Sequence, residues 1–140
     1  FFFKQKTAYE IKECDWSSDV CSSDLPSKVH VCHCTDCQKL SGSAYRVVSR
    51  APYDSFRVLS GQPKQYVKQA DSGRNMIQAF CPDCGTPIYG AHETDPTFCG
   101  IRVTTLDQRL QLKPSLQIWC ESTLDWAEHL YMVPRIGEHI

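Results

Sequence analysis

From Pro26 onward, short runs of aromatic and β-branched residues alternate with turn residues, a pattern typical of a mainly β protein. The runs predict strands at residues 45–49, 55–59, 65–69, 75–80, 88–89, 98–104 and 116–119. Asp71-Ser72-Gly73 predicts a hairpin turn between the third and fourth strands, because glycine adopts the positive φ of a tight turn. Ala51-Pro52 is expected to separate the first two strands, and residues 35–42 are expected to form one or two helical turns.

The first 25 residues break this pattern. They begin with three phenylalanines, repeat Ser-Ser-Asp and show no steady apolar period. They also resemble translated sequencing-adapter read-through, and such segments are set apart from fold reasoning. Residues 1–25 are therefore interpreted as a non-native leader, and residues 26–140 as a single domain of a size that one core can support.

Composition and charge exclude several classes of function. The chain is 41% hydrophobic and 22% charged, as ordinary globular proteins are. Its formal net charge is -1 and its lysines and arginines form no block, so no nucleic-acid partner is expected. No run approaches the roughly 20 apolar residues that span a bilayer, so no membrane association is expected and a cytoplasmic location is predicted. The sequence leaves the oligomeric state open.

Nine cysteines carry the candidate chemistry, and without a secretory signal they are interpreted as reduced thiols and metal ligands. Cys32, Cys34 and Cys37 lie within six positions, and thiolates at this spacing can wrap one zinc ion. A structural zinc normally has four protein ligands, whereas a catalytic zinc keeps one position for water or substrate. The cluster therefore predicts an open, catalytic zinc site with these three cysteines as metal ligands.

The histidines near this cluster are weaker candidates. His33 is expected to face away from the ion, because adjacent residues of an extended chain point to opposite sides and Cys32 and Cys34 share the other side. His92 is a lesser candidate for a ligand or a proton-transfer group. Lys39, Arg46 and Arg50 could bind an anion, but solvated surface positions are favoured for all three. Core or rim packing is expected for four residues in apolar surroundings: Cys99, Trp119, Cys120 and Trp126.

A second cysteine pair, Cys81 and Cys84 in the run CPDCG, has the form of a zinc knuckle. A redox Cys-x-x-Cys would be expected to open a helix in a βαβ unit, but Thr86 and Pro87 follow at once, so zinc is favoured. One four-cysteine site could combine this pair with Cys34 and Cys37. Such ribbons separate their pairs by about 15 to 20 residues, and the interval from residue 37 to residue 81 is longer.

Several motifs in order resemble one known family. They are CHCTDCQ and GSAY at residues 32–45, FCPDCGTPIY at residues 80–89, and TLD and IW at residues 105–119. From about Val29 onward, the chain closely resembles the glutathione-dependent formaldehyde-activating enzymes, a family that includes centromere protein V. The resemblance implies a β-tent fold, in which small antiparallel sheets carry zinc and there is little helix.

The resemblance also implies an activity and a set of ligands. The family reaction is of the carbon–sulfur lyase type and interconverts glutathione, formaldehyde and S-hydroxymethylglutathione, so a glutathione-like thiol is the implied partner. Cys32, Cys34 and Cys37 would hold the active-site zinc, and Cys81 and Cys84 would supply half of a structural zinc site. Because a centromere protein belongs to the family, a non-catalytic zinc-organised binding module is the alternative.

The N-terminus departs from the family pattern. Family members normally begin with a glycine-rich strand whose Cys-x-Cys completes the structural zinc site, and residues 1–25 stand in that place. The chain is therefore expected to be truncated at its beginning. Since closing a structural zinc site contributes on the order of 10 kcal/mol to folding, the chain is expected to bind its second zinc poorly.

Overall fold

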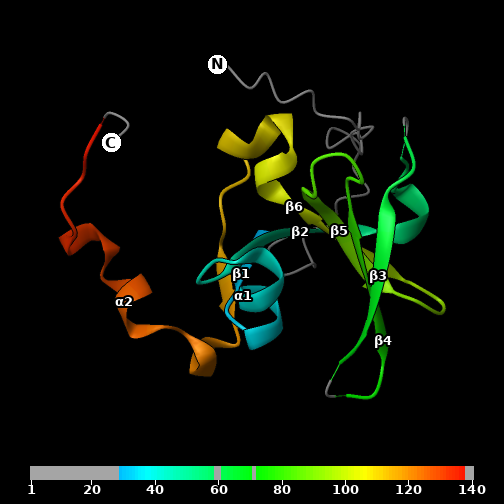
Figure 1. Ribbon diagram of the computed structural model, residues 1–140, viewed down its shortest axis with the longest axis horizontal. Helices are drawn as coiled ribbons and strands as arrows, with labels where there is room; N and C mark the ends of the chain where they lie inside the picture. The colour runs from blue at the N-terminus through cyan, green and yellow to red at the C-terminus, as the bar shows by residue number, and fades with distance from the viewer. Residues whose placement is uncertain (1–28, 59–60, 71, 138–140) are drawn as a thin grey trace.

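The computed structural model describes residues 29–58, 61–70 and 72–137. Within these ranges a seven-stranded sheet has the order β3-β4-β5-β6-β2-β1-β7 (Figure 1). The strands are β1 (Val29–Cys32), β2 (Arg46–Pro52), β3 (Lys64–Gln69), β4 (Asn75–Phe80), β5 (Pro87–His92), β6 (Phe98–Arg102) and β7 (Leu116–Ile118). Neighbours pair antiparallel, except that β1 and β7 are parallel. The mainly β class is confirmed, with one continuous sheet in place of the expected small ones.

Helix is scarce in the described part of the chain, as expected. The helix α1 (Thr35–Ser41) follows β1, and Gly42 ends it in the left-handed conformation with a φ of 62°. The other helical segments are single turns: α2 (Asp125–Glu128), η1 (Tyr53–Ser55), η2 (Val103–Thr105), η3 (Asp107–Leu110), η4 (Cys120–Ser122) and η5 (Leu130–Met132). None of the described helices is long and apolar enough to cross a membrane.

The predicted hairpin is confirmed, whereas two other strand predictions are wrong. β3 and β4 pair over their whole length, and Gly73 in the turn has a φ of 80°; Asp71 lies outside the described residues. Ala51-Pro52 does not lie between strands, because both residues belong to the end of β2, where they pair with Cys99 and Phe98 of β6. Residues 55–58 form no regular strand, since η1 turns the chain and Phe56 packs its ring against Tyr89 at 4.7 Å between centroids. Residue 59 is outside the described ranges.

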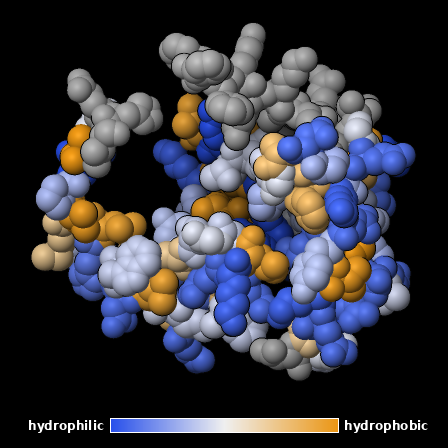
Figure 2. Space-filling model, viewed as in Figure 1, coloured by the Kyte–Doolittle hydropathy of each residue, from blue (hydrophilic) through white to orange (hydrophobic). Residues whose placement is uncertain are grey.

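The C-terminal segment corrects three packing predictions. After β7 the chain leaves the sheet and extends away from the body of the molecule (Figure 1). Trp119 is 65% exposed and Trp126 is 58% exposed, and the Cys120 thiol is exposed, so none of the three packs as expected. Trp119 also has a φ of 59°, a left-handed conformation that ends the strand after Ile118. Further apolar side chains lie exposed along this segment, among them Leu130, Met132, Val133 and Ile136 (Figure 2).

Strand register gives the sheet two chemically different faces. Residues paired across neighbouring strands point to the same side of a sheet. One row runs through Ala51, Cys99, Ala91 and Ile77, and the next through Ser49, Ile101, Tyr89 and Ala79. These positions build most of the buried apolar core, so the packing predicted for Cys99 is confirmed at 1% exposure.

The opposite face of the same strands is polar. Its central row runs through Arg50, Gly100, Gly90 and Gln78, and a parallel row pairs Arg102 with Val48 and His30. Cys32, two residues after His30 in β1, pairs on the same face with Arg46, two residues before Val48 in β2. The fold therefore carries the cysteine cluster and several arginines on the side of the sheet away from the core.

Candidate metal centre

Three thiols converge where β1 passes into α1. Cys32 is the last residue of β1, Cys34 is the N-cap of α1, and Cys37 lies in its first turn. The Sγ atoms of all three lie within 4.8 Å of one another, with Cys32 and Cys34 3.5 Å apart. The Cys34 Sγ also accepts a hydrogen bond from the backbone N–H of Cys37 at 3.4 Å, so the helix start holds the sulfur atoms together.

The spacing of these sulfur atoms suits a tetrahedral metal ion. Zinc–sulfur bonds of about 2.3 Å at tetrahedral angles put sulfur atoms roughly 3.8 Å apart, and small side-chain movements bring the three thiols to that value. Within the described ranges, these three cysteines are the one group of three or more potential metal ligands that lie close together. Soft thiolates favour zinc over hard ions such as magnesium or calcium. Cys32, Cys34 and Cys37 could therefore hold zinc, with the fourth position left for another ligand.

The protein environment shifts the pKa values of the three thiols in different directions. A hydrogen bond from the Cys32 thiol lowers the pKa of Cys37 to about 6, and the positive charges of Arg46 and Arg102 add to this effect. The same hydrogen bond raises the pKa of Cys32, and burial raises it further. Burial is also the main cause of the raised pKa of Cys34. The cluster thus favours a thiolate at Cys37 before any metal is bound.

His33 lies on the other side of the strand from the thiols, as predicted. Its Nε2 makes a 2.8 Å hydrogen bond with Oε1 of Gln117, and its ring meets Tyr45 edge-on with centroids 5.6 Å apart. The side chain is only 3% exposed. Buried contacts with Gln117 and Tyr45 therefore hold this histidine, while its Nδ1 has no hydrogen-bond partner among the described residues.

The second cysteine pair forms a tight knuckle after β4. The backbone N–H of Gly85 donates to the carbonyl of Cys81, and Gly85 has a φ of 72°. Cys81 is buried in the apolar core, whereas Cys84 is exposed and its Sγ lies 3.0 Å from Oγ1 of Thr86. No third ligand joins the pair within the described ranges, and Cys14 and Cys21 lie outside them. Zinc binding by this pair stays a prediction.

Sequence reasoning missed the polar residues that surround the cluster. Arg46, predicted to be solvated, is 7% exposed, and so is Arg102, which the sequence did not single out. Lys39 and Arg50 are exposed, as expected. The available signal was the two-residue spacing of Arg46, Val48 and Arg50, which places them on one face, but only the strand register brings Arg102 beside them.

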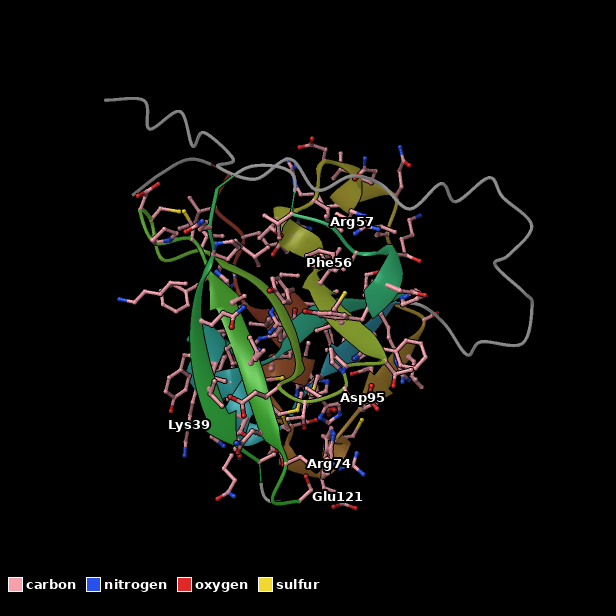
Figure 3. The ribbon with its side chains drawn as sticks, turned by 90° about the vertical axis from the view of Figure 1, so that its right-hand side faces the viewer. Lys39, Phe56, Arg57, Arg74, Asp95 and Glu121 are labelled. Atoms are coloured by element: carbon pink, nitrogen blue, oxygen red, sulfur yellow. The ribbon has the colours of Figure 1, made fainter. Side chains whose placement is uncertain are left out.

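A cavity of about 1010 Å³ opens on this polar face of the sheet. Cys37, Arg46 and Arg102 line the cavity, and so does His92, a lesser candidate from the sequence. Arg74 and Asp95, two further lining residues, lie at the end of the molecule opposite Arg57 (Figure 3). The volume is at the upper end of small-molecule sites, so a cavity large enough for a small molecule adjoins the thiol cluster.

These features define a mainly β protein with a three-thiol cluster that could hold a metal ion, beside an arginine-lined cavity. The family model for glutathione-dependent formaldehyde-activating enzymes matches residues 14–122, and the chain belongs to this family. A Penicillium rubens protein is 29% identical over 123 residues, covering 83% of this chain and 63% of that protein. A Colletotrichum graminicola protein is 26% identical over 99 residues, covering 69% and 51%. Both bear the name "Putative glutathione-dependent formaldehyde-activating enzyme".

This chain therefore spans between about half and two thirds of the length of these two relatives. A crystal structure of a Rhodobacter sphaeroides protein resembles the model with a TM-score of 0.51 at 18% identity. The likeness covers 79% of this chain and 92% of that one. At this level of identity it shows a shared fold.

Proposed function

We propose that the protein is a zinc-dependent enzyme of the carbon–sulfur lyase type that acts on the adduct of a glutathione-like thiol and formaldehyde. The observation that carries the proposal is the opening of the three-thiol cluster, through Cys37, onto a cavity of about 1010 Å³. Three ligands leave one position of a tetrahedral ion for substrate. Family membership supplies the class of substrate.

The proposed reaction forms one carbon–sulfur bond and transfers one proton. In the forward direction the sulfur of the thiol forms a bond to the carbonyl carbon of formaldehyde, and the thiol proton ends on the former carbonyl oxygen. Zinc held by Cys32, Cys34 and Cys37 would supply Lewis-acid activation of the thiol, because the thiolate is the form that attacks a carbonyl.

The described residues contribute a second effect. Arg46 and Arg102 place two positive charges against the same cavity, and positive charge near a thiol favours its ionised form. The cavity lining also holds His30, whose pKa is lowered by burial and by Arg50 and Arg102. A neutral imidazole at this position can accept a proton from an entering thiol.

The test follows exchange between glutathione, formaldehyde and their adduct by NMR line shapes and exchange spectroscopy. Purified zinc-loaded protein is expected to speed the exchange in proportion to its concentration. Cys37→Ser is expected to lose both zinc and the acceleration. Cys120→Ser is the matched control, because Cys120 is exposed and lies outside the cluster. Zinc-loaded protein that leaves the exchange rate unchanged would refute the enzyme and favour the non-catalytic binding module.

A further inference from the structure

Two arginines lie buried side by side on the site face of the sheet. Arg46 belongs to β2 and Arg102 ends β6, and each is 7% exposed. Both guanidinium groups donate to the same oxygen, Oε1 of Gln78, at 3.1 Å from Arg46 and 2.8 Å from Arg102. Arg102 donates once more, to the carbonyl of Gly100 at 3.1 Å. A neutral amide oxygen thus joins two buried positive charges.

Neither arginine has a carboxylate partner within the described ranges, although both lie close enough to Cys37 to lower the pKa of its thiol. The ion pair found there joins Lys68 to Asp36 and involves neither arginine. The Nε atoms of Arg46 and Arg102 are buried and have no hydrogen-bond partner among the described residues. Buried charges in proteins are normally paired, because an isolated one loses its hydration without compensation. The arrangement therefore leaves unused donors and excess positive charge beside the cavity.

Two glycines in β5 and β6 leave room for the Arg102 guanidinium. A Cβ on Gly90 would lie 3.1 Å from Nη2 of Arg102 and 3.4 Å from Oε1 of Gln78. Gly90 pairs with Gly100 on the next strand, so two adjacent strands lack side chains under the Arg102 guanidinium. The Arg102 guanidinium therefore lies close over the two glycines, where its hydrogen bonds to Gln78 and Gly100 fix its orientation.

The negative charge of the thiol cluster does not fully neutralise the two arginines. Cys37 lines the same cavity as the two arginines. Three thiolates around a divalent zinc carry a net charge of about −1, whereas the arginine pair carries about +2. Elsewhere in the lining, Arg50 and Arg74 balance Glu93 and Asp95. One further negative charge is needed for balance, and it has to enter through the cavity.

We propose that Arg46 and Arg102, bridged by Gln78, form a carboxylate-binding site that selects thiols carrying a carboxylate group. Arginine suits this task because its fork of N–H donors matches the two oxygens of a carboxylate. The identity of the ligand as a thiol rests on the proposed function, whereas the binding of a carboxylate does not. The site would orient the substrate while its sulfur reaches the cysteine cluster.

The test compares two ligands that differ only in charge, 3-mercaptopropionate and its amide 3-mercaptopropionamide. Their affinities for the zinc-loaded full chain are measured by isothermal titration calorimetry. The carboxylate is expected to bind about tenfold to a hundredfold more tightly, as hydrogen bonds to charged groups imply. Equal affinities for the two thiols would overturn the proposal.

The decisive variant is Gln78→Glu, which places a carboxylate within hydrogen-bond distance of both guanidinium groups. It is expected to raise the melting temperature and to reduce the preference for 3-mercaptopropionate to less than about threefold, because the built-in carboxylate occupies the site. Gln111→Glu makes the same charge change at an exposed position outside the cavity lining and is expected to leave both properties unchanged. A Gln78→Glu protein that keeps the full preference would contradict the proposal.

Propionate, which has no thiol, separates this proposal from the proposed function. If neither thiol binds but propionate binds to the wild-type chain and not to Gln78→Glu, the carboxylate site stands and the thiol chemistry fails. If propionate and 3-mercaptopropionate bind the wild type and Gln78→Glu equally, the carboxylate site fails whatever the thiol result. Arg46→Met provides a second variant, and it is expected to lose the preference in the same way.

Discussion

Gly100 lies close to Val48 and Arg102 on the polar face, so its replacement tests the packing beside the Arg102 guanidinium. A Cβ on residue 100 would lie 2.8 Å from Cγ1 of Val48. Carbon atoms in contact prefer about 3.5–4.0 Å, so one of the two groups must move by roughly 0.7–1.2 Å. Val48 is 6% exposed and β-branched, and its χ1 has little freedom in a strand.

These values set the expected effect of Gly100→Ala. Overpacking costs about 1–3 kcal/mol, and the lower entropy of the unfolded chain offsets about 0.4–1 kcal/mol of this. The net loss of unfolding free energy is therefore expected to be about 1.3 kcal/mol, within limits of about 0 and 2.6 kcal/mol. Val48→Ala alone removes two buried methyl groups and is expected to lose about 2 kcal/mol.

The double variant carries the test. In Val48→Ala with Gly100→Ala, the new methyl has no Cγ1 to meet and fills part of the vacated space. The combined loss is expected to be about 1–2 kcal/mol smaller than the sum of the single losses, as for residues in contact. Urea unfolding followed by circular dichroism measures all four proteins at one fixed zinc concentration. Losses that add to within about 0.5 kcal/mol would refute the contact and the register that creates it.

Two further predictions concern the core and the thiols. Ile88 is 3% exposed in the apolar core, so Ile88→Ala is expected to lower the unfolding free energy by about 2–5 kcal/mol. Leu110 is 83% exposed, so Leu110→Ala is expected to change it by less than about 0.5 kcal/mol. Equal losses for the two variants in urea unfolding would contradict this expectation. In metal-free protein, the ultraviolet absorption of thiolate is expected to show one cysteine ionising near pH 6. Arg46→Gln should shift that step to higher pH, because it removes a positive charge that favours the thiolate; an unmoved step would count against the assignment.

The sequence predicted those parts of the site that depend on near neighbours. Cys32, Cys34 and Cys37 span six positions, so a strand end and one helical turn suffice to bring their sulfur atoms together. The hairpin around Gly73 was equally predictable, because a positive φ there needs no distant partner. The orientation of His33, away from the thiols, followed from the alternation of side chains along an extended chain.

Predictions that depended on distant partners failed more often. The aromatic character of residues 55–58 favoured a strand, but Phe56 finds its burial against Tyr89 on another strand. Trp119 and Trp126 are apolar enough for a core, yet the chain leaves the sheet before either can pack. In each case hydrophobic character was identified correctly, while the partner that would bury it depended on tertiary structure.

The arginine site shows this division most clearly. Residue types and local spacing in the sequence determined a mainly β chain, a three-thiol cluster and the family to which it belongs. Gln78 lies 32 residues from Arg46 and 24 from Arg102, so only the register of β4, β5, β6 and β2 brings them together. A one-residue slip would send every side chain of a strand to the opposite face. The tertiary structure alone therefore decided that two strand arginines are buried beside the thiols and not solvated.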